Sequence, residues 1–240
     1  DAWPMLLLLL VIVSVGIWFI RPAPPRHVKL DVGSKSGSYE QMGKKYAEFF
    51  AKNGITLELV YTAGSADNIE RLRKQIDPLQ AAFVQGGLMH RSDAAELVSL
   101  GSIDFEPLWF FYRADRFKDN DPDDSHYLSQ PVAIGRPGSG TYAQAIHLMT
   151  INGIADSPNF RQMSNTEGVE AFRRGDVSAL FLVEGMESEN LQAVLADPIT
   201  RVRSFRRAAA YTKHLPFYHE VHIPEAALNL KRDFPAQNTT

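Results

Sequence analysis

The chain of 240 residues contains no cysteine, which excludes disulfide bridges, thiolate zinc sites, iron–sulfur clusters and a cysteine nucleophile. It also has no excess of positive charge, because 25 lysines and arginines stand against 28 aspartates and glutamates, for a net charge of −3. A nucleic-acid partner is therefore not expected. The remaining composition, with 45% hydrophobic and 22% charged residues, is that of a globular protein.

Familiar catalytic motifs are also missing. The sequence has no nucleophile elbow, no zinc-binding HExxH helix and no evident pair of catalytic carboxylates. Segment 37–45 resembles a P-loop, but five residues instead of four separate its glycines, and Lys45 stands where a magnesium-binding hydroxyl is required. Segment 138–143 is a weak match to the dinucleotide fingerprint, and Asp156 falls in a turn rather than at a strand end. We expect neither an enzyme, nor a catalytic residue, nor a cofactor.

Two polar segments carry residue types that bind metals. One contains suitable zinc or copper ligands: His214, His219, Glu220 and His222. In an extended segment Glu220 and His222 share one face while His219 points the other way, so these side chains do not converge locally. The acidic loop 119–124 has calcium-binding residue types, but it lacks the turn glycine and the final glutamate of a calcium loop. We therefore predict no metal site.

A long hydrophobic run is present at the N-terminal end. Residues 2–20 carry no charge, and a helix of that length, at about 1.5 Å per residue, approaches the thickness of a bilayer. Trp3 and Trp18 lie near its ends, as interfacial aromatic residues do. Prolines crowd the candidate signal-peptidase site, so we expect an uncleaved transmembrane anchor at 1–21, followed by a stiff proline-rich linker at 22–26.

The rest of the sequence alternates between strand-like and helix-like patterns, which is typical of an α/β protein. The apolar alternation at 27–32 predicts a strand, the glycine- and serine-rich segment 33–38 a loop, and the following apolar spacing a helix that ends near Gly54. Further strands are expected at 56–61 and 81–84, with a short helix between them.

The same order of elements returns about 99 residues further along the chain. A strand at 132–134, a glycine-rich loop and a helix that ends at Gly153 repeat the first unit. The spacing is also repeated, since 31 residues separate Gly54 from Gln85 and 31 separate Gly153 from Glu184. We therefore expect two α/β lobes that share one plan.

Each lobe carries glycine- and serine-rich loops between a strand and a helix, and these loops predict an anion-binding cleft. Free N–H groups in a first helical turn and the helix dipole both favour a carboxylate or a phosphate, and glycine allows close approach of the backbone. The serines and threonines can instead cap the helices, so capping and ligand contact are alternative interpretations of the same loops.

Six short blocks of sequence follow one another at a characteristic spacing after the apolar segment. They are Gly37-Ser38-Tyr39 with Gly43, Thr62-Ala63-Gly64-Ser65 with Asn68, and segments 81–86, 100–102, 106–113 and 137–141. In order and spacing they resemble the TAXI-type solute-binding subunits of tripartite ATP-independent periplasmic (TRAP) transporters. The resemblance covers most of the chain after the apolar segment.

This resemblance implies a two-lobed, type II periplasmic-binding-protein fold, an α/β fold that closes over a small ligand. It places lobe I at 27–112, lobe II at 113–206 and a return segment to lobe I at 207–240. A strand at 108–112 is expected to cross between the lobes. Because the family continues with a further strand and helix that complete lobe I, the return segment is expected to be incomplete.

The resemblance also implies a function. The protein is expected to capture a small carboxylate, such as a glutamate-like amino acid, for a TRAP-type permease of the inner membrane, with its soluble domain in the periplasm. A membrane-tethered ligand sensor that signals to a membrane partner is the alternative.

The matching family loops place ligand contacts on two walls, and three charged residues depart from the family pattern: Glu40, Arg136 and Glu184. Arg136 can pair with a ligand carboxylate, with Glu184 or with solvent, and Glu184 can bind a ligand ammonium. The expected ligand-binding residues are Ser36, Gly37, Ser38, Tyr39, Ala63, Gly64, Ser65, Gln85, Arg136, Gly138, Ser139, Gly140, Thr141 and Glu184.

Overall fold

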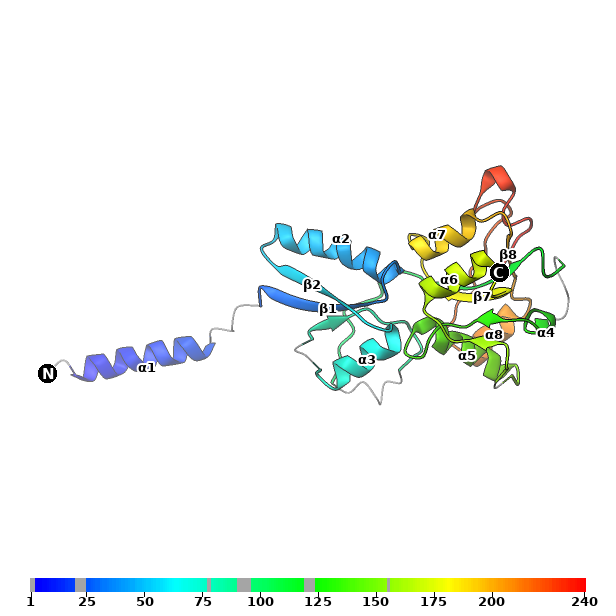
Figure 1. The fold of residues 1–240 in the computed structure, drawn as a ribbon. Coiled ribbons are helices and arrows are strands. Elements are labelled where there is room, and N and C mark those ends of the chain that lie inside the picture. The colour runs from blue at the N-terminus through cyan, green and yellow to red at the C-terminus, as the bar shows by residue number, and fades with distance from the viewer. Residues whose placement is uncertain (1–2, 20–24, 77–78, 90–95, 119–123, 155) are drawn as a thin grey trace.

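The computed structural model describes residues 3–19, 25–76, 79–89, 96–118, 124–154 and 156–240. After an N-terminal helix, the chain forms two α/β lobes, each built around its own sheet (Figure 1). The lobes lie side by side, with the glycine-rich loops at their junction.

The N-terminal helix α1 (Trp3–Phe19) stands apart from both lobes (Figure 1), and its large apolar side chains that the structure describes are exposed. It has 17 residues, which corresponds to about 25 Å at 1.5 Å per residue, against about 30 Å for the hydrocarbon core of a bilayer. Within the described parts of the chain, none of the helices combines the length and the apolar character needed to cross a membrane. The transmembrane anchor expected at 1–21 is thus not supported by this helix.

Lobe I is built on a parallel three-stranded sheet in the order β2-β1-β3. Its elements are β1 (His27–Gly33), α2 (Ser38–Lys52), β2 (Thr56–Tyr61), α3 (Ser65–Arg73) and β3 (Ala81–Ala82). Asn53 caps the end of α2, and Gly54, with φ +74°, turns the chain into β2. The strands and helices predicted from the sequence in this lobe are confirmed, with β3 shorter than expected.

Lobe II contains a five-stranded sheet in the order β6-β5-β7-β4-β8. Its elements are β4 (Leu108–Arg113), α4 (Asp124–Tyr127), β5 (Val132–Ala133), α5 (Gly140–Ile151), β6 (Phe160–Arg161), α6 (Asn165–Arg174), β7 (Ala179–Val183), α7 (Glu189–Ala196) and β8 (Thr200–Val202). Strands β6, β5 and β7 are parallel and repeat the arrangement of β2, β1 and β3 in lobe I. The predicted internal repeat is therefore confirmed.

The largest apolar core of the described structure lies on both faces of the lobe II sheet. Alternate side chains of a strand point to opposite faces, so Phe111 and Leu180 pack under α6 and α7 while Phe110 and Phe181 pack on the other face with α5. The ring centroids of Phe110 and Phe181 are 4.5 Å apart. This double-sided core gives the cleft a rigid wall on the lobe II side.

Strand β4 differs from the sequence-based expectation, which treated 108–112 as a crossing strand and ended lobe I at 112. In the structure β4 lies within the lobe II sheet, between β7 and β8. An antiparallel ladder runs from Leu108 opposite Val183 to Tyr112 opposite Ala179, and it covers the apolar strand β7. The division between the lobes therefore falls before Leu108.

The C-terminal segment, expected to return to lobe I over 207–240, packs largely on lobe II (Figure 1) and also contacts lobe I, where Phe217 lies against Gly87. It contains α8 (Ala208–His214) and the short 3₁₀ helix η2 (Leu230–Arg232). Phe234 is buried in the lobe II core, and the Arg232 guanidinium donates hydrogen bonds to the carbonyls of Leu195, at 2.9 Å, and Asp197, at 3.1 Å. Burial of this ring and these bonds explain why the end of the segment packs on lobe II.

Candidate functional site

The glycine-rich loops of the two lobes meet face to face. Gly138, in lobe II, accepts hydrogen bonds at its carbonyl from the N–H groups of Ala66, at 3.1 Å, and Asp67, at 3.2 Å, in the first turn of α3. Gly64 approaches so closely that a Cβ added there would lie 3.0 Å from the Cα of Ser139. A backbone carbonyl of lobe II therefore caps a helix of lobe I at the place where the sequence predicted a ligand anion.

The N-terminus of α2 is occupied by a carboxylate of the protein itself. Glu184, at the end of β7, accepts the N–H of Ser38 at 2.8 Å, and it is 3% exposed. Its other oxygen accepts the side-chain N–H groups of Asn165, at 2.8 Å, and Asn190, at 3.3 Å. The helix dipole favours a negative charge at this position, so Glu184 holds lobe II against lobe I.

A second carboxyl group, from Glu106 in the segment before β4, lies at the same junction. It accepts the hydroxyl protons of Ser38, at 2.6 Å, and Tyr39, at 2.7 Å. Burial, together with the nearby charge of Glu184, raises the pKa of Glu106 to about 7. Burial and the neighbouring Glu106 also raise the pKa of Tyr39 well above its ordinary value.

Ser65 and Gln85 extend this network along lobe I. The Ser65 hydroxyl oxygen accepts the backbone N–H of Gln85 at 3.1 Å and lies 3.1 Å from the Tyr39 hydroxyl. The Gln85 side chain packs on the backbone of Gly140, where an added Cβ would lie 2.0 Å from Oε1. Within the described residues this oxygen is buried without a hydrogen-bond partner. The structure thus brings the predicted residues of both walls into one network.

Other predicted residues support the loops rather than point into an open space. The Ser139 hydroxyl accepts the N–H of Tyr142 at 3.1 Å, which caps α5, and the Thr141 hydroxyl accepts the N–H of Val183 at 3.0 Å. The N–H of Ala63 donates to Asp67 at 2.9 Å. For Ser139 the capping interpretation is therefore correct in this structure.

The loop before α2 contacts lobe II through its backbone. The Ser36 carbonyl accepts the Ser188 hydroxyl at 3.4 Å, and the Lys35 carbonyl accepts the Thr166 hydroxyl at 3.3 Å. A Cβ added to Gly37 would lie 3.5 Å from a carboxylate oxygen of Glu184. The loop therefore lies against the carboxylate that caps α2.

A pocket of about 690 Å³ remains between the lobes at this junction. Two cations from opposite lobes line it, Lys35 from lobe I and Arg136 from lobe II. Its other lining residues are Ser34, Tyr61, Thr62, Ala63, Asp67, Ser164, Thr166 and Glu167.

The two cations can still donate hydrogen bonds to a ligand. In the described part of the chain the Arg136 guanidinium makes one long hydrogen bond, 3.4 Å, to the carbonyl of Thr62. The Lys35 ammonium lies 5.3 Å from the centroid of the Tyr61 ring. The acidic Glu167 is already bonded to Ser164 in a capping box, which holds its pKa below the ordinary value. The pocket can therefore bind an anion between the lobes.

Sequence reasoning missed Lys35 and Glu106 as site residues. Lys35 lies in the predicted loop 33–38 and could have been found as the cation matching Arg136 in the second lobe. Glu106 falls in one of the family-like blocks. It is 67 residues from Tyr39 in the sequence, so no local pattern predicts that it lies beside α2.

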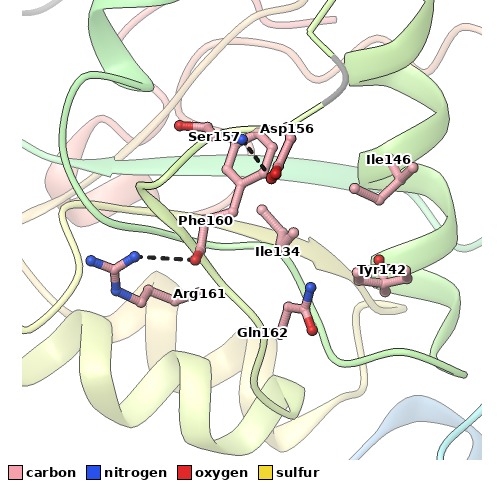
Figure 2. Close-up of a pocket in the computed structure, with 8 residues that line it drawn as sticks. All are labelled: Ile134, Tyr142, Ile146, Asp156, Ser157, Phe160, Arg161 and Gln162. Atoms are coloured by element: carbon pink, nitrogen blue, oxygen red, sulfur yellow. Dashed lines mark hydrogen bonds between the residues drawn. The ribbon is translucent and has the colours of Figure 1, made fainter.

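A second pocket, of about 560 Å³, lies on one flank of lobe II (Figure 2). Ile134, Tyr142, Ile146, Asp156, Ser157, Phe160, Arg161 and Gln162 line it. Its charged groups bond to neighbouring backbone, since Arg161 donates to the carbonyls of Pro158 and Phe160 and Asp156 accepts the N–H of Ser157. All lining residues come from one lobe, so a ligand there would not link the lobes.

The potential metal ligands are not brought together. Among the residues that the structure describes, no three His, Cys, Asp or Glu side chains form a group suited to a metal ion. His222 contacts the Thr240 hydroxyl at 3.1 Å and lies 3.8 Å from Glu220. Residues 119–123 of the acidic loop lie outside the described residues.

No protein-family model and no curated protein matches the chain. Solved structures share its fold at low identity. The alkanesulfonate-binding protein SsuA from Xanthomonas axonopodis pv. citri, bound to MOPS, is 13% identical with a TM-score of 0.51, over 81% of this chain and 70% of that one. A protein from Bordetella bronchiseptica is 12% identical with a TM-score of 0.57, over 79% of this chain and 60% of that one. A full-length BenM mutant is 12% identical with a TM-score of 0.50, over 83% of this chain and 63% of that one.

Two repeated α/β lobes, a pocket between them and this structural likeness define a solute-binding-protein fold. The expected two-lobed α/β class is thereby confirmed. The chain spans 60% to 70% of the length of these three structures.

Proposed function

We propose that the protein is an extracytoplasmic solute-binding protein that captures a small carboxylate, such as an amino acid, in the pocket between its lobes. The observation that carries this proposal is the placement of Lys35 and Arg136, from opposite lobes, on one pocket. A carboxylate that bonds to both cations links the lobes and favours their closed arrangement by its differential affinity for that arrangement.

The surface of α2 adds exposed contacts between the lobes to the buried ones at the junction. Gln41 donates to Glu189 at 3.2 Å, and Lys45 forms an ion pair with Glu187. These exposed contacts are each weak, and a ligand that forms charge-assisted bonds to both lobes adds to them and to the buried bonds.

We propose a TRAP-type permease of the inner membrane as the partner, in line with the TAXI-like blocks of the sequence, with the lobes in the periplasm. The ligand-bound, closed arrangement would be the form that the permease recognises. A tethered sensor would use the same pocket but signal to another membrane partner. Ligand uptake by vesicles that contain the permease, dependent on added protein, supports delivery, and binding without uptake supports the sensor.

We also propose that segment 1–21 attaches the chain to the membrane. The absence of charge from 2 to 20 and the exposed apolar side chains of α1 support this proposal. The full chain should then stay with the membrane fraction after carbonate extraction, whereas a chain that begins at Arg26 should be released. Release of both chains would contradict the proposal.

The pocket is tested by calorimetric titration of the full chain with amino acids and small carboxylates, after bound ligand has been removed. Arg136→Gln should weaken binding about 10- to 100-fold, because it removes a charge-assisted hydrogen bond. Arg161→Gln, at the lobe II pocket, is the matched control and should bind as the wild type does. Unchanged affinity of Arg136→Gln would contradict the proposed site.

A further inference from the structure

We infer that Glu184 makes the site between the lobes selective for solutes with one acidic group and against solutes with two, glutamate included. This inference rests on the proposed function, because it concerns which carboxylates the pocket accepts. It narrows the glutamate-like ligand expected from the sequence to a solute that carries no second acidic group.

Two carboxyl groups of the protein, Glu184 and Glu106, already lie at the junction between the lobes. The donors that the sequence assigned to a ligand carboxylate are used by the protein, since Ser38 donates its N–H to Glu184 and its hydroxyl to Glu106. Every hydrogen bond that the described residues make to these two carboxyl groups comes from a neutral donor, an amide or a hydroxyl. No cation of the described chain therefore balances their charge at hydrogen-bond distance.

Glu184 adjoins the pocket through the N-terminus of α6. Asn165 donates its side-chain N–H to Glu184 at 2.8 Å, and its chain neighbours Ser164 and Thr166 both line the pocket. On the lobe I side, the loop that carries Lys35 also carries Gly37, which lies against the same carboxylate. Glu184 does not itself line the pocket, so its charge acts on a ligand held by Lys35 and Arg136 across the N-terminus of α6.

The charge at the inner end of a ligand decides how it interacts with Glu184. A second carboxylate carries the same charge and is repelled, because the oxygens of Glu184 are buried and their hydrogen bonds come from neutral donors. An amide, hydroxyl or ammonium at that end meets no such repulsion.

The test compares matched ligand pairs that differ at one end, glutamine with glutamate and butyrate with succinate, by calorimetric titration of the full chain in detergent at pH 7.5. We expect each monoacid to bind at least about tenfold more tightly than its diacid partner, since like charges repel in a partly desolvated site. In Glu184→Gln, which keeps the size of the side chain and removes its charge, the gap should shrink to about threefold or less. The wild-type comparison does not depend on the folding of any variant.

Glu170→Gln is the matched control, because Glu170 lies on α6, is exposed and pairs with Arg174 of the same helix. It should keep the wild-type preference. Equal or tighter binding of the diacids by the wild type overturns the inference and leaves the proposed function standing. An unchanged gap in Glu184→Gln also overturns it. Binding of none of the four ligands overturns the proposed function and the inference with it.

Discussion

The carboxyl group of Glu106 predicts a pH dependence of stability that one substitution removes. Glu106 accepts hydrogen bonds from Ser38 and Tyr39 and lies close to the charge of Glu184. Burial favours its neutral form, so its pKa in the native structure is about 7 against an ordinary value of 4.5. Glu106→Gln keeps a neutral, hydrogen-bonding side chain of the same shape and takes the titration away.

The direction of the pH dependence of stability follows from the number of protons that the native and unfolded states bind. Between pH 4.5 and pH 7 the native state holds a proton on Glu106 that the unfolded state has released, so the free energy of unfolding falls as pH rises. The stabilisation is fully present below pH 4.5, is lost as the pH rises through 7 and changes little above that. A pKa shift of this size corresponds to a change of about 3 kcal/mol in the free energy of unfolding. Because Glu106 keeps part of its surface in water, we expect about 2 kcal/mol.

The assay is urea unfolding of the full chain, followed by circular dichroism at pH 5 and pH 8. The wild type should lose about 2 kcal/mol more than Glu106→Gln over this range, because other titrating groups contribute equally to both chains. Glu70→Gln, on the exposed face of α3, is the control and should follow the wild type. The same pH dependence in wild type and Glu106→Gln would refute the reasoning.

Two further substitutions test the junction and the core. Gly140→Ala should displace the end of the Gln85 side chain, because the new Cβ would lie 2.0 Å from its Oε1. The free energy of unfolding in urea should then fall by about 1 kcal/mol, whereas Gly86→Ala, which has open space around it, should leave it unchanged. Phe172→Ala, at a fully buried position, should lower the free energy of unfolding by about 3 to 5 kcal/mol in urea, and a loss below about 1 kcal/mol would contradict its place in the core.

Local signals in the sequence were sufficient for the elements of lobe I. The turn at Asn53-Gly54 and the alternation over 56–61 fix where α2 ends and β2 runs, and the structure has both at those places. The repeat was also visible, because its evidence is a spacing along the chain. These features depend on residues close together in sequence, which is why sequence reasoning reached them.

The arrangement of the site depends on contacts between distant residues, which no local pattern encodes. Ser38 and Glu184 are 146 residues apart in the sequence. Only the structure shows that Glu184 occupies the N-terminus of α2, where the sequence predicted a ligand anion. The place of β4 was likewise missed, since its apolar run fits a crossing strand as well as a central strand of lobe II. The packing of the end of the C-terminal segment on lobe II was also missed, because burial of Phe234 cannot be inferred from its neighbours in sequence.

The bond from the Gly138 carbonyl to the N–H groups of Ala66 and Asp67 has a consequence for how this protein can change. Both partners are main-chain atoms, so substitutions in the two loops leave these bonds in place, except at the closely packed Gly64 and Gly138. Only proline at 66 or 67, which has no N–H, deletes one of them outright. Substitutions of side chains around the pocket can therefore change which solute binds. The alignment of the two lobes is kept, because it depends on backbone atoms.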